Sequence, residues 1–101
     1  MKPVVPHPNA EAEFHDAVDY YEQCAEGFGA RFRDEIEASV ERIVEQPNRF
    51  SVYEATPCRE CPVKVFPYTV YYTEEVERIW VLAFVHQRRK PGYWLRRLRD
   101  R

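Results

Sequence analysis

The chain has 101 residues, of which 45% are hydrophobic and 15% aromatic, and it carries a formal net charge of −2. This length is typical of one domain, and this apolar content supplies a core and excludes wholesale disorder. No apolar run reaches the ~18 residues that a membrane span needs, so we expect no membrane contact.

Two helices are predicted in the first half of the chain. Asn9 can cap a helix that continues to Cys24, and a second helix is expected over residues 30–45. Gly27 and Gly29 between them predict a tight turn, so the two helices form an antiparallel hairpin. The apolar stripes at helical spacing are Ala10, Phe14, Ala17, Val18, Tyr21 and Cys24, then Phe32, Ile36, Val40, Ile43 and Val44. Each stripe is too narrow to form a core alone, so a flat layer must cover them.

Strands are predicted in the second half. Residue types favour short strands over residues 50–55 and 63–66 and stronger ones over residues 68–73 and 78–85. The last run is apolar at odd and even positions, which indicates a central strand covered on both faces, or covered on one face and bound by a partner on the other. A short terminal helix is expected over residues 93–99. This order predicts a single α+β domain, with the N-terminal helical hairpin packed on one face of the sheet.

Cys58-Arg59-Glu60-Cys61 forms a C-x-x-C motif. A structural zinc site needs four ligands, and the third cysteine, Cys24, is distant in sequence. In an extended chain the two Cα atoms would lie ~10 Å apart, beyond the ~7 Å that a disulfide spans. We therefore expect two strand-edge thiols and no metal or cofactor, with an added thiol or metal function as the alternative. An odd number of cysteines and the absence of an N-terminal apolar stretch favour the cytoplasm.

Positive charge is concentrated near the end of the chain. Residues 86–101 hold seven Arg and Lys against one acid, whereas residues 1–50 hold 11 acids and five bases. This polarity suggests an anionic partner, and a solvated tail, or one folded back on the acidic helices, is the alternative. Alternating cations and rings suit nucleic acid, although Tyr93 and Trp94 could instead fix the terminal helix to the core. His86 can exchange a proton near neutral pH.

Six short segments, in chain order, carry a family resemblance: residues 10–14, 17–22, 47–50, 66–72, 81–89 and 91–94. Together they resemble the RelE/ParE superfamily of toxins from type II bacterial toxin–antitoxin systems, which include plasmid stabilisation proteins. The resemblance implies two N-terminal helices against a small, curved antiparallel sheet. It also implies a cognate antitoxin, which would lie over the hairpin and sheet in a toxin–antitoxin hetero-oligomer. Residues such as Trp80, Leu82 and Phe84 are candidates for that contact, with core packing as the alternative.

The superfamily has two branches, and the resemblance implies different chemistry for each. RelE-like members cut messenger RNA on the ribosome, whereas ParE-like members poison DNA gyrase without cutting nucleic acid. Carried over by position, the RelE-like catalytic set would be His86, Arg59, Arg89 (or Arg88) and Tyr93, with His86 or Tyr93 moving protons and the arginines neutralising the phosphorane. Further target contacts would come from Lys64, Arg88, Lys90, Trp94, Arg96 and Arg97.

Charge favours the ParE-like branch for this chain. The predicted strands carry few cations, and the net charge is negative, whereas a protein that lies against ribosomal RNA is usually positive. Gyrase poisoning is therefore the first hypothesis, and ribosome-dependent cleavage is the rival, so whether the chain is an enzyme stays open. An inactive member that only binds its antitoxin is the further alternative.

Overall fold

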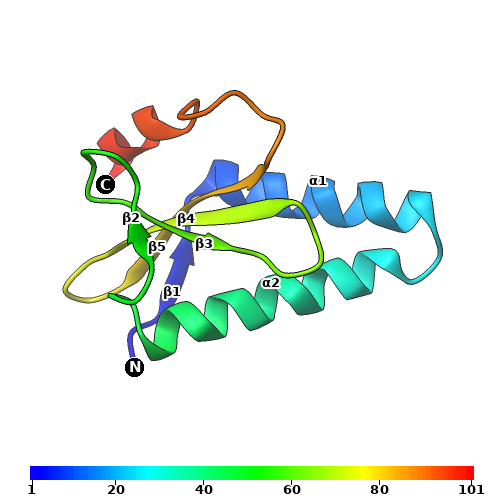
Figure 1. The fold of residues 1–101 in the computed structure, drawn as a ribbon, viewed down its shortest axis with the longest axis horizontal. Coiled ribbons are helices and arrows are strands. Elements are labelled where there is room, and N and C mark those ends of the chain that lie inside the picture. Colours follow the sequence, from blue (N-terminus) through cyan, green and yellow to red (C-terminus); the bar gives the residue numbers. More distant parts are fainter.

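The computed structural model describes all 101 residues and arranges them in three layers (Figure 1): a helical hairpin, a five-stranded sheet and a C-terminal segment on the far face. The elements are β1 (Val4–Pro6), α1 (Pro8–Cys24), α2 (Phe28–Glu45), β2 (Ser51–Val52), β3 (Arg59–Pro62), β4 (Tyr68–Glu74), β5 (Ile79–His86) and a 3-10 helix, η1 (Leu95–Asp100). The predicted α+β class and helical hairpin are confirmed, and the short terminal helix is a 3-10 helix.

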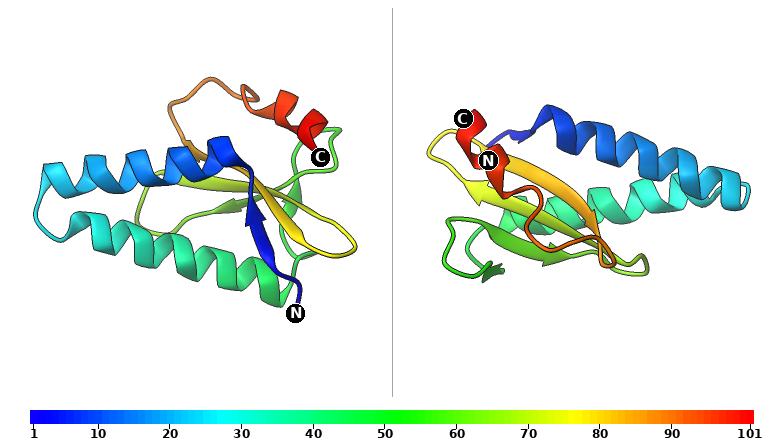
Figure 2. Two further views of the ribbon diagram at one scale, coloured as in Figure 1. Left: turned by 180° about the vertical axis from the view of Figure 1, so that it is seen from behind. Right: turned by 90° about the horizontal axis from the view of Figure 1, so that it is seen from above.

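The sheet is mixed rather than purely antiparallel. Its strand order is β1-β5-β4-β3-β2, and β1 runs parallel to β5 while every other pairing is antiparallel. The back view in Figure 2 shows β1 beside β5. Strand β1 was not predicted, because two valines followed by a proline are too short a run to indicate a strand. Only the partner strand, about 75 residues later in the chain, makes this segment extended.

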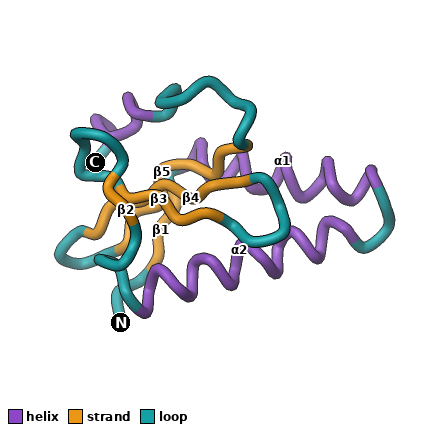
Figure 3. The backbone as a smooth tube through the Cα atoms, viewed as in Figure 1, coloured by secondary structure: helices purple, strands orange, loops and turns teal.

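The third strand lies earlier in the chain than expected. The prediction placed it over residues 63–66, but the structure pairs Arg59–Pro62 with β4 and leaves residues 63–67 as the connection. Likewise only Ser51–Val52 of the predicted strand 50–55 pairs with a neighbour. Val65 has a φ of +73°, which no extended strand can contain. Figure 3 shows the resulting long connection between β3 and β4.

The two helices approach closely near the turn that joins them. Gly27, with a φ of +88°, precedes α2 in a conformation that favours glycine. A Cβ atom at Gly29 would lie 2.9 Å from the carbonyl oxygen of Val18 on α1. The sequence predicted a turn at these glycines, and the second of them also permits the tight contact between the helices.

Helix α1 is capped by His7 and not by Asn9 as predicted. His7 Nδ1 accepts a hydrogen bond from the Asn9 backbone N–H at 3.0 Å, and His7 Nε2 lies 2.7 Å from Asp100 Oδ2. The buried ring therefore joins the start of α1 to the end of η1. A histidine is a rare cap, so the sequence rule selected the exposed asparagine that follows the proline.

We expect His7→Ala to lower the free energy of unfolding by about 1–2 kcal/mol, because it removes the cap and the contact with Asp100. The measurement is urea unfolding followed by circular dichroism. Asn9→Ala is the matched control and should change the value by less than about 0.5 kcal/mol, since Asn9 is exposed. A larger loss in Asn9→Ala than in His7→Ala would show that Asn9 and not His7 is the cap.

Each face of the sheet has its own core. On the helix side, buried residues of both helices pack on the sheet around Phe32, Val70 and Tyr72. On the other side, Trp94 is 1% exposed and its ring stacks on Tyr71 with the centroids 4.3 Å apart. Strand β5 is buried along almost its whole length, so the prediction that it is covered on both faces is confirmed.

The three apolar residues proposed as an antitoxin contact all belong to these cores. Trp80 and Leu82 lie under the C-terminal segment, and Phe84 lies on the helix side. Trp80 and Leu82 are buried within the chain and have a core-packing role, whereas Phe84, which is 8% exposed, also lines a pocket between the helices.

Candidate partner-binding surfaces

One end of the sheet gathers exposed cations. The β3–β4 connection lies beside the turn after β5, because the Gln87 N–H donates to the Pro67 carbonyl oxygen at 2.8 Å and Tyr68 pairs with His86. Four exposed cations stand on these two segments: Lys64, Arg88, Arg89 and Lys90. We call this surface, on the right of the sheet in Figure 1, the basic end. The β4–β5 loop at the other end carries three Glu in residues 74–77.

A pocket of about 350 Å³ opens at the basic end. Its lining residues are Glu13, Asp16, Ala17, Tyr20, Tyr68, Phe84, His86, Arg89 and Tyr93. The structure therefore brings together three of the four residues predicted for RNA cleavage. The guanidinium of Arg89 lies over the Tyr93 ring at 4.1 Å, and His86 Nδ1 accepts the backbone N–H of Arg88 at 3.0 Å.

Arg59, the fourth member of that set, lies elsewhere. It pairs with Tyr72, whereas His86 pairs with Tyr68, four residues or about 13 Å away along β4. Its Nη1 donates to the carbonyl oxygen of Phe50 at 2.7 Å. Arg59 shares the strand parity of Cys61, which packs on the helix side, and the C-terminal segment lies on the opposite face. The catalytic set that the family resemblance implied is therefore not assembled around one site, because Arg59 lies apart from the other three residues.

The Glu13 carboxylate fastens the C-terminal segment to α1. It accepts hydrogen bonds from the Tyr93 hydroxyl, from both terminal nitrogens of Arg97 at 3.0 and 2.9 Å, and from the Phe84 backbone N–H at 3.2 Å. Arg97 also donates to the Leu82 carbonyl oxygen at 2.8 Å. We call these side chains, Glu13, Tyr93 and Arg97, the latch.

The latch satisfies backbone groups that a bulge leaves unpaired. Strand β1 pairs with β5 only as far as Val81, and the β4–β5 register then skips Leu82. Beyond that point the outer edge of β5 has no neighbouring strand, and such an edge needs other partners. Arg97 and Glu13 supply them at Leu82 and Phe84. Arg97 is only 9% exposed, so it has a structural role that its sequence prediction as a target contact did not include.

Burial, followed by the hydrogen bond to Glu13, raises the pKa of Tyr93 to about 12. The phenol therefore stays protonated near neutral pH and acts as a hydrogen-bond donor to Glu13 rather than as a base. Of the other predicted contacts, Trp94 is buried in the far core and Arg96 is exposed on η1.

The two cysteines of the C-x-x-C motif point to opposite faces of the sheet. Cys61 belongs to the helix-side core and Cys58 to the core under the C-terminal segment, so the two thiols cannot meet on one ion. Both are buried rather than exposed at a strand edge, and desolvation raises both pKa values. A protonated, buried thiol is a weak nucleophile.

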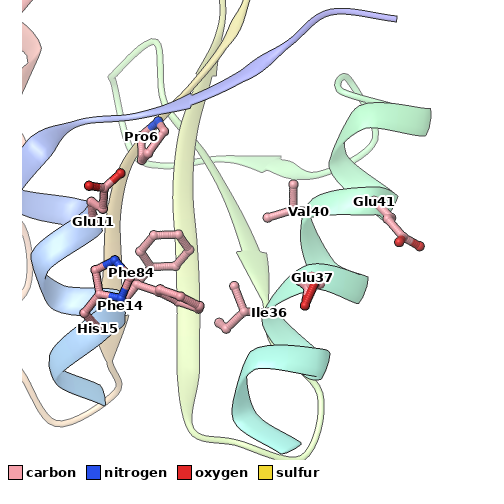
Figure 4. A pocket seen from close by; sticks show the side chains of 9 residues that line it. All are labelled: Pro6, Glu11, Phe14, His15, Ile36, Glu37, Val40, Glu41 and Phe84. Atoms are coloured by element: carbon pink, nitrogen blue, oxygen red, sulfur yellow. The ribbon is translucent and has the colours of Figure 1, made fainter. Parts of the chain in front are cut away.

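A second pocket, of about 460 Å³, lies between the two helices. Figure 4 shows Phe84 at its base, with Phe14 on one side and Ile36 and Val40 on the other. Its remaining lining residues are Pro6, Glu11, His15, Glu37 and Glu41. We call it the acidic groove, because three glutamates surround an apolar floor. Sequence analysis missed it, although its acids flank the two predicted apolar stripes.

Two features are absent from the structure. No group of three or more His, Cys, Asp or Glu side chains is arranged to hold a metal ion. No helix combines the length and the apolar character that a bilayer crossing requires.

Comparisons with known proteins identify relatives. A family model described as "ParE toxin of type II toxin-antitoxin system, parDE" matches residues 4–91. Among solved structures, one described as "Chromosomal ParDE TA system from P. aeruginosa" matches with a TM-score of 0.71 and 16% identity, over 85% of this chain and 96% of that one. No curated protein matches the chain significantly. At 16% identity the structural match supports the fold alone.

Proposed function

The chain belongs to the ParE toxin family of type II toxin–antitoxin systems, and on that premise we propose that it arrests growth by binding and poisoning DNA gyrase in the cytoplasm. One observation carries the choice of target: the chain's own C-terminal segment packs on the sheet face opposite the helices. A pocket of about 340 Å³ remains there, and Arg89 is the only Lys or Arg among its lining residues, beside Glu54. That face therefore offers no broad, cation-lined surface on which an RNA strand could lie.

The chemistry that RNA cleavage requires also favours gyrase as the target. Cleavage by 2′-OH attack needs a base, an acid and a charge-neutralising group around one phosphate. His86, Arg89 and Tyr93 share a pocket, but Arg59 does not line it and lies about 13 Å along β4 from the strand position of His86. Glu13 and Asp16 line the same pocket, and their negative charge opposes a phosphodiester. The proposed function uses no metal and no cofactor.

The basic end is the surface that we assign to the target. Lys64, Arg88 and Lys90 are exposed there and have no acidic partner among the ion pairs of the structure. Such unpaired cations suit an acidic protein surface or the phosphates of gyrase-bound DNA. Trp94 and Arg97, in contrast, act by holding the C-terminal segment in place.

We assign the acidic groove to a cognate antitoxin, in a toxin–antitoxin hetero-oligomer. Its apolar floor and three glutamates suit an amphipathic segment that presents an apolar side chain flanked by Lys or Arg. The antitoxin and the target would then use surfaces of opposite charge.

Induced expression without antitoxin tests the choice of target. Growth arrest with gyrase-linked DNA breaks, no cut transcripts, and inhibition of purified gyrase would support the proposal. Ribosome-dependent transcript cleavage that His86→Ala abolishes would support the RelE-like alternative instead. Unaffected growth would support the further alternative, an inactive family member that only binds its antitoxin.

A further inference from the structure

We propose that Lys64 and Val65, the tip of the β3–β4 connection, recognise the target protein by inserting a valine side chain into an apolar depression beside an acidic residue. This inference rests on the proposed function and names the part of the basic end that confers specificity.

Val65 has a strained backbone and an exposed side chain. Its φ of +73° lies in the left-handed region, which β-branched residues rarely adopt and which Gly or Asn would occupy at lower cost. The side chain is 71% exposed, so packing within the chain does not offset the strain. The fold thus keeps an unfavourable conformation at a residue that contributes little to its own core, and such strain is typical of functional positions.

The strained tip is held rigidly from both sides. Val63 and Phe66 are buried in the helix-side core, where the Phe66 ring lies 4.8 Å from that of Tyr21. The Val63 N–H donates to the Tyr68 carbonyl oxygen at 2.9 Å, and the Tyr68 N–H donates to the Phe66 carbonyl oxygen at 2.8 Å. A tip that is already ordered loses little entropy on binding.

Val65 differs in its position from the other residues that are strained or exposed. The only other non-glycine residue with a positive φ is Glu54, which is polar. Val76 is 90% exposed in the β4–β5 loop, but its φ is not positive and its neighbours are glutamates. Val65 alone combines a strained backbone and an exposed apolar side chain with neighbouring cations. These cations are Lys64 and the basic residues of the turn that follows Gln87.

Val65→Asn tests the inference, because asparagine tolerates the left-handed conformation and removes the apolar side chain. We expect the melting temperature to rise by about 4 °C, while growth arrest on induced expression and inhibition of purified gyrase both weaken about tenfold. Binding to the antitoxin should not change, since the acidic groove lies between the helices. Val76→Asn is the matched control and should alter none of these readouts.

The outcomes separate the two proposals. If the native chain arrests growth without inhibiting gyrase, the choice of gyrase is wrong, and the growth readout still tests the tip. A Val65→Asn variant that arrests growth as strongly as the native chain would overturn the tip as a recognition element. Loss of antitoxin binding or of thermal stability in that variant would overturn it as well, because the effect would then be one of folding. A native chain that leaves growth unaffected would overturn both proposals.

Discussion

Glu13→Ala is expected to lower the free energy of unfolding by about 3 kcal/mol, the largest stability loss that we predict for a single substitution. The carboxylate accepts hydrogen bonds from Tyr93, Arg97 and the Phe84 backbone N–H. Removing one member of a buried ion pair leaves the other charge uncompensated, which typically costs 3–5 kcal/mol. The side chain of Glu13 is 18% exposed, so water can enter and the lower end of that range applies. The measurement is chemical denaturation at neutral pH.

Glu11→Ala is the matched control, because Glu11 lies on the same helix and is exposed. It should change stability by less than about 0.5 kcal/mol. A double-mutant cycle with Arg97→Ala then isolates the pair, and we expect the two losses to be strongly non-additive because both substitutions release the same segment. A loss below about 1 kcal/mol for Glu13→Ala would mean that the C-terminal segment is held by Trp94 packing and not by the latch.

The helices could be predicted from sequence because their signals are local. The second helix was expected over residues 30–45 and occupies Phe28–Glu45, since its apolar stripe repeats at helical spacing in a continuous run. Strand β1 and the true position of β3 were missed because each depends on a partner distant in sequence. No local signal in Val4–Pro6 indicates that residues 79–81 will lie beside it. Arg59–Pro62 holds two charged residues and a proline, so it resembles a strand less than the more apolar residues 63–66 that follow.

The candidate site could be predicted only in part, for a related reason. The sequence pointed to the region from His86 onward, and three of its four proposed catalytic residues line one pocket. It could not reveal that Arg97 and Trp94 turn inward, because a cation or ring in a short helix looks the same whether it faces solvent or an unpaired strand edge. Arg97 turns inward to the carbonyl oxygen of Leu82, at a bulge that a uniformly apolar strand does not signal in sequence, and Trp94 turns inward to stack on Tyr71.

Reversing two charges of the acidic groove is expected to weaken antitoxin binding about 100-fold. Glu37 and Glu41 lie one helical turn apart on α2 and both line the groove, and the double variant replaces each of them with Lys. If the antitoxin presents Lys or Arg there, each substitution replaces attraction by repulsion, and a tenfold loss per site corresponds to about 1.4 kcal/mol. The measurement is the dissociation constant from titration calorimetry, together with rescue of growth by co-expressed antitoxin.

The double variant Asp19→Lys/Asp34→Lys separates the effect of the groove on antitoxin binding from the effect of net charge. Both aspartates are exposed on the helices and lie outside the groove, so this control changes the total charge by the same amount. It should bind the antitoxin as the native chain does, apart from a modest effect on the association rate. Gyrase inhibition should survive in both double variants, because the basic end is untouched. Equal weakening of antitoxin binding by the two double variants would mean that the antitoxin senses the overall acidity of the hairpin, and the groove would lose its assigned role.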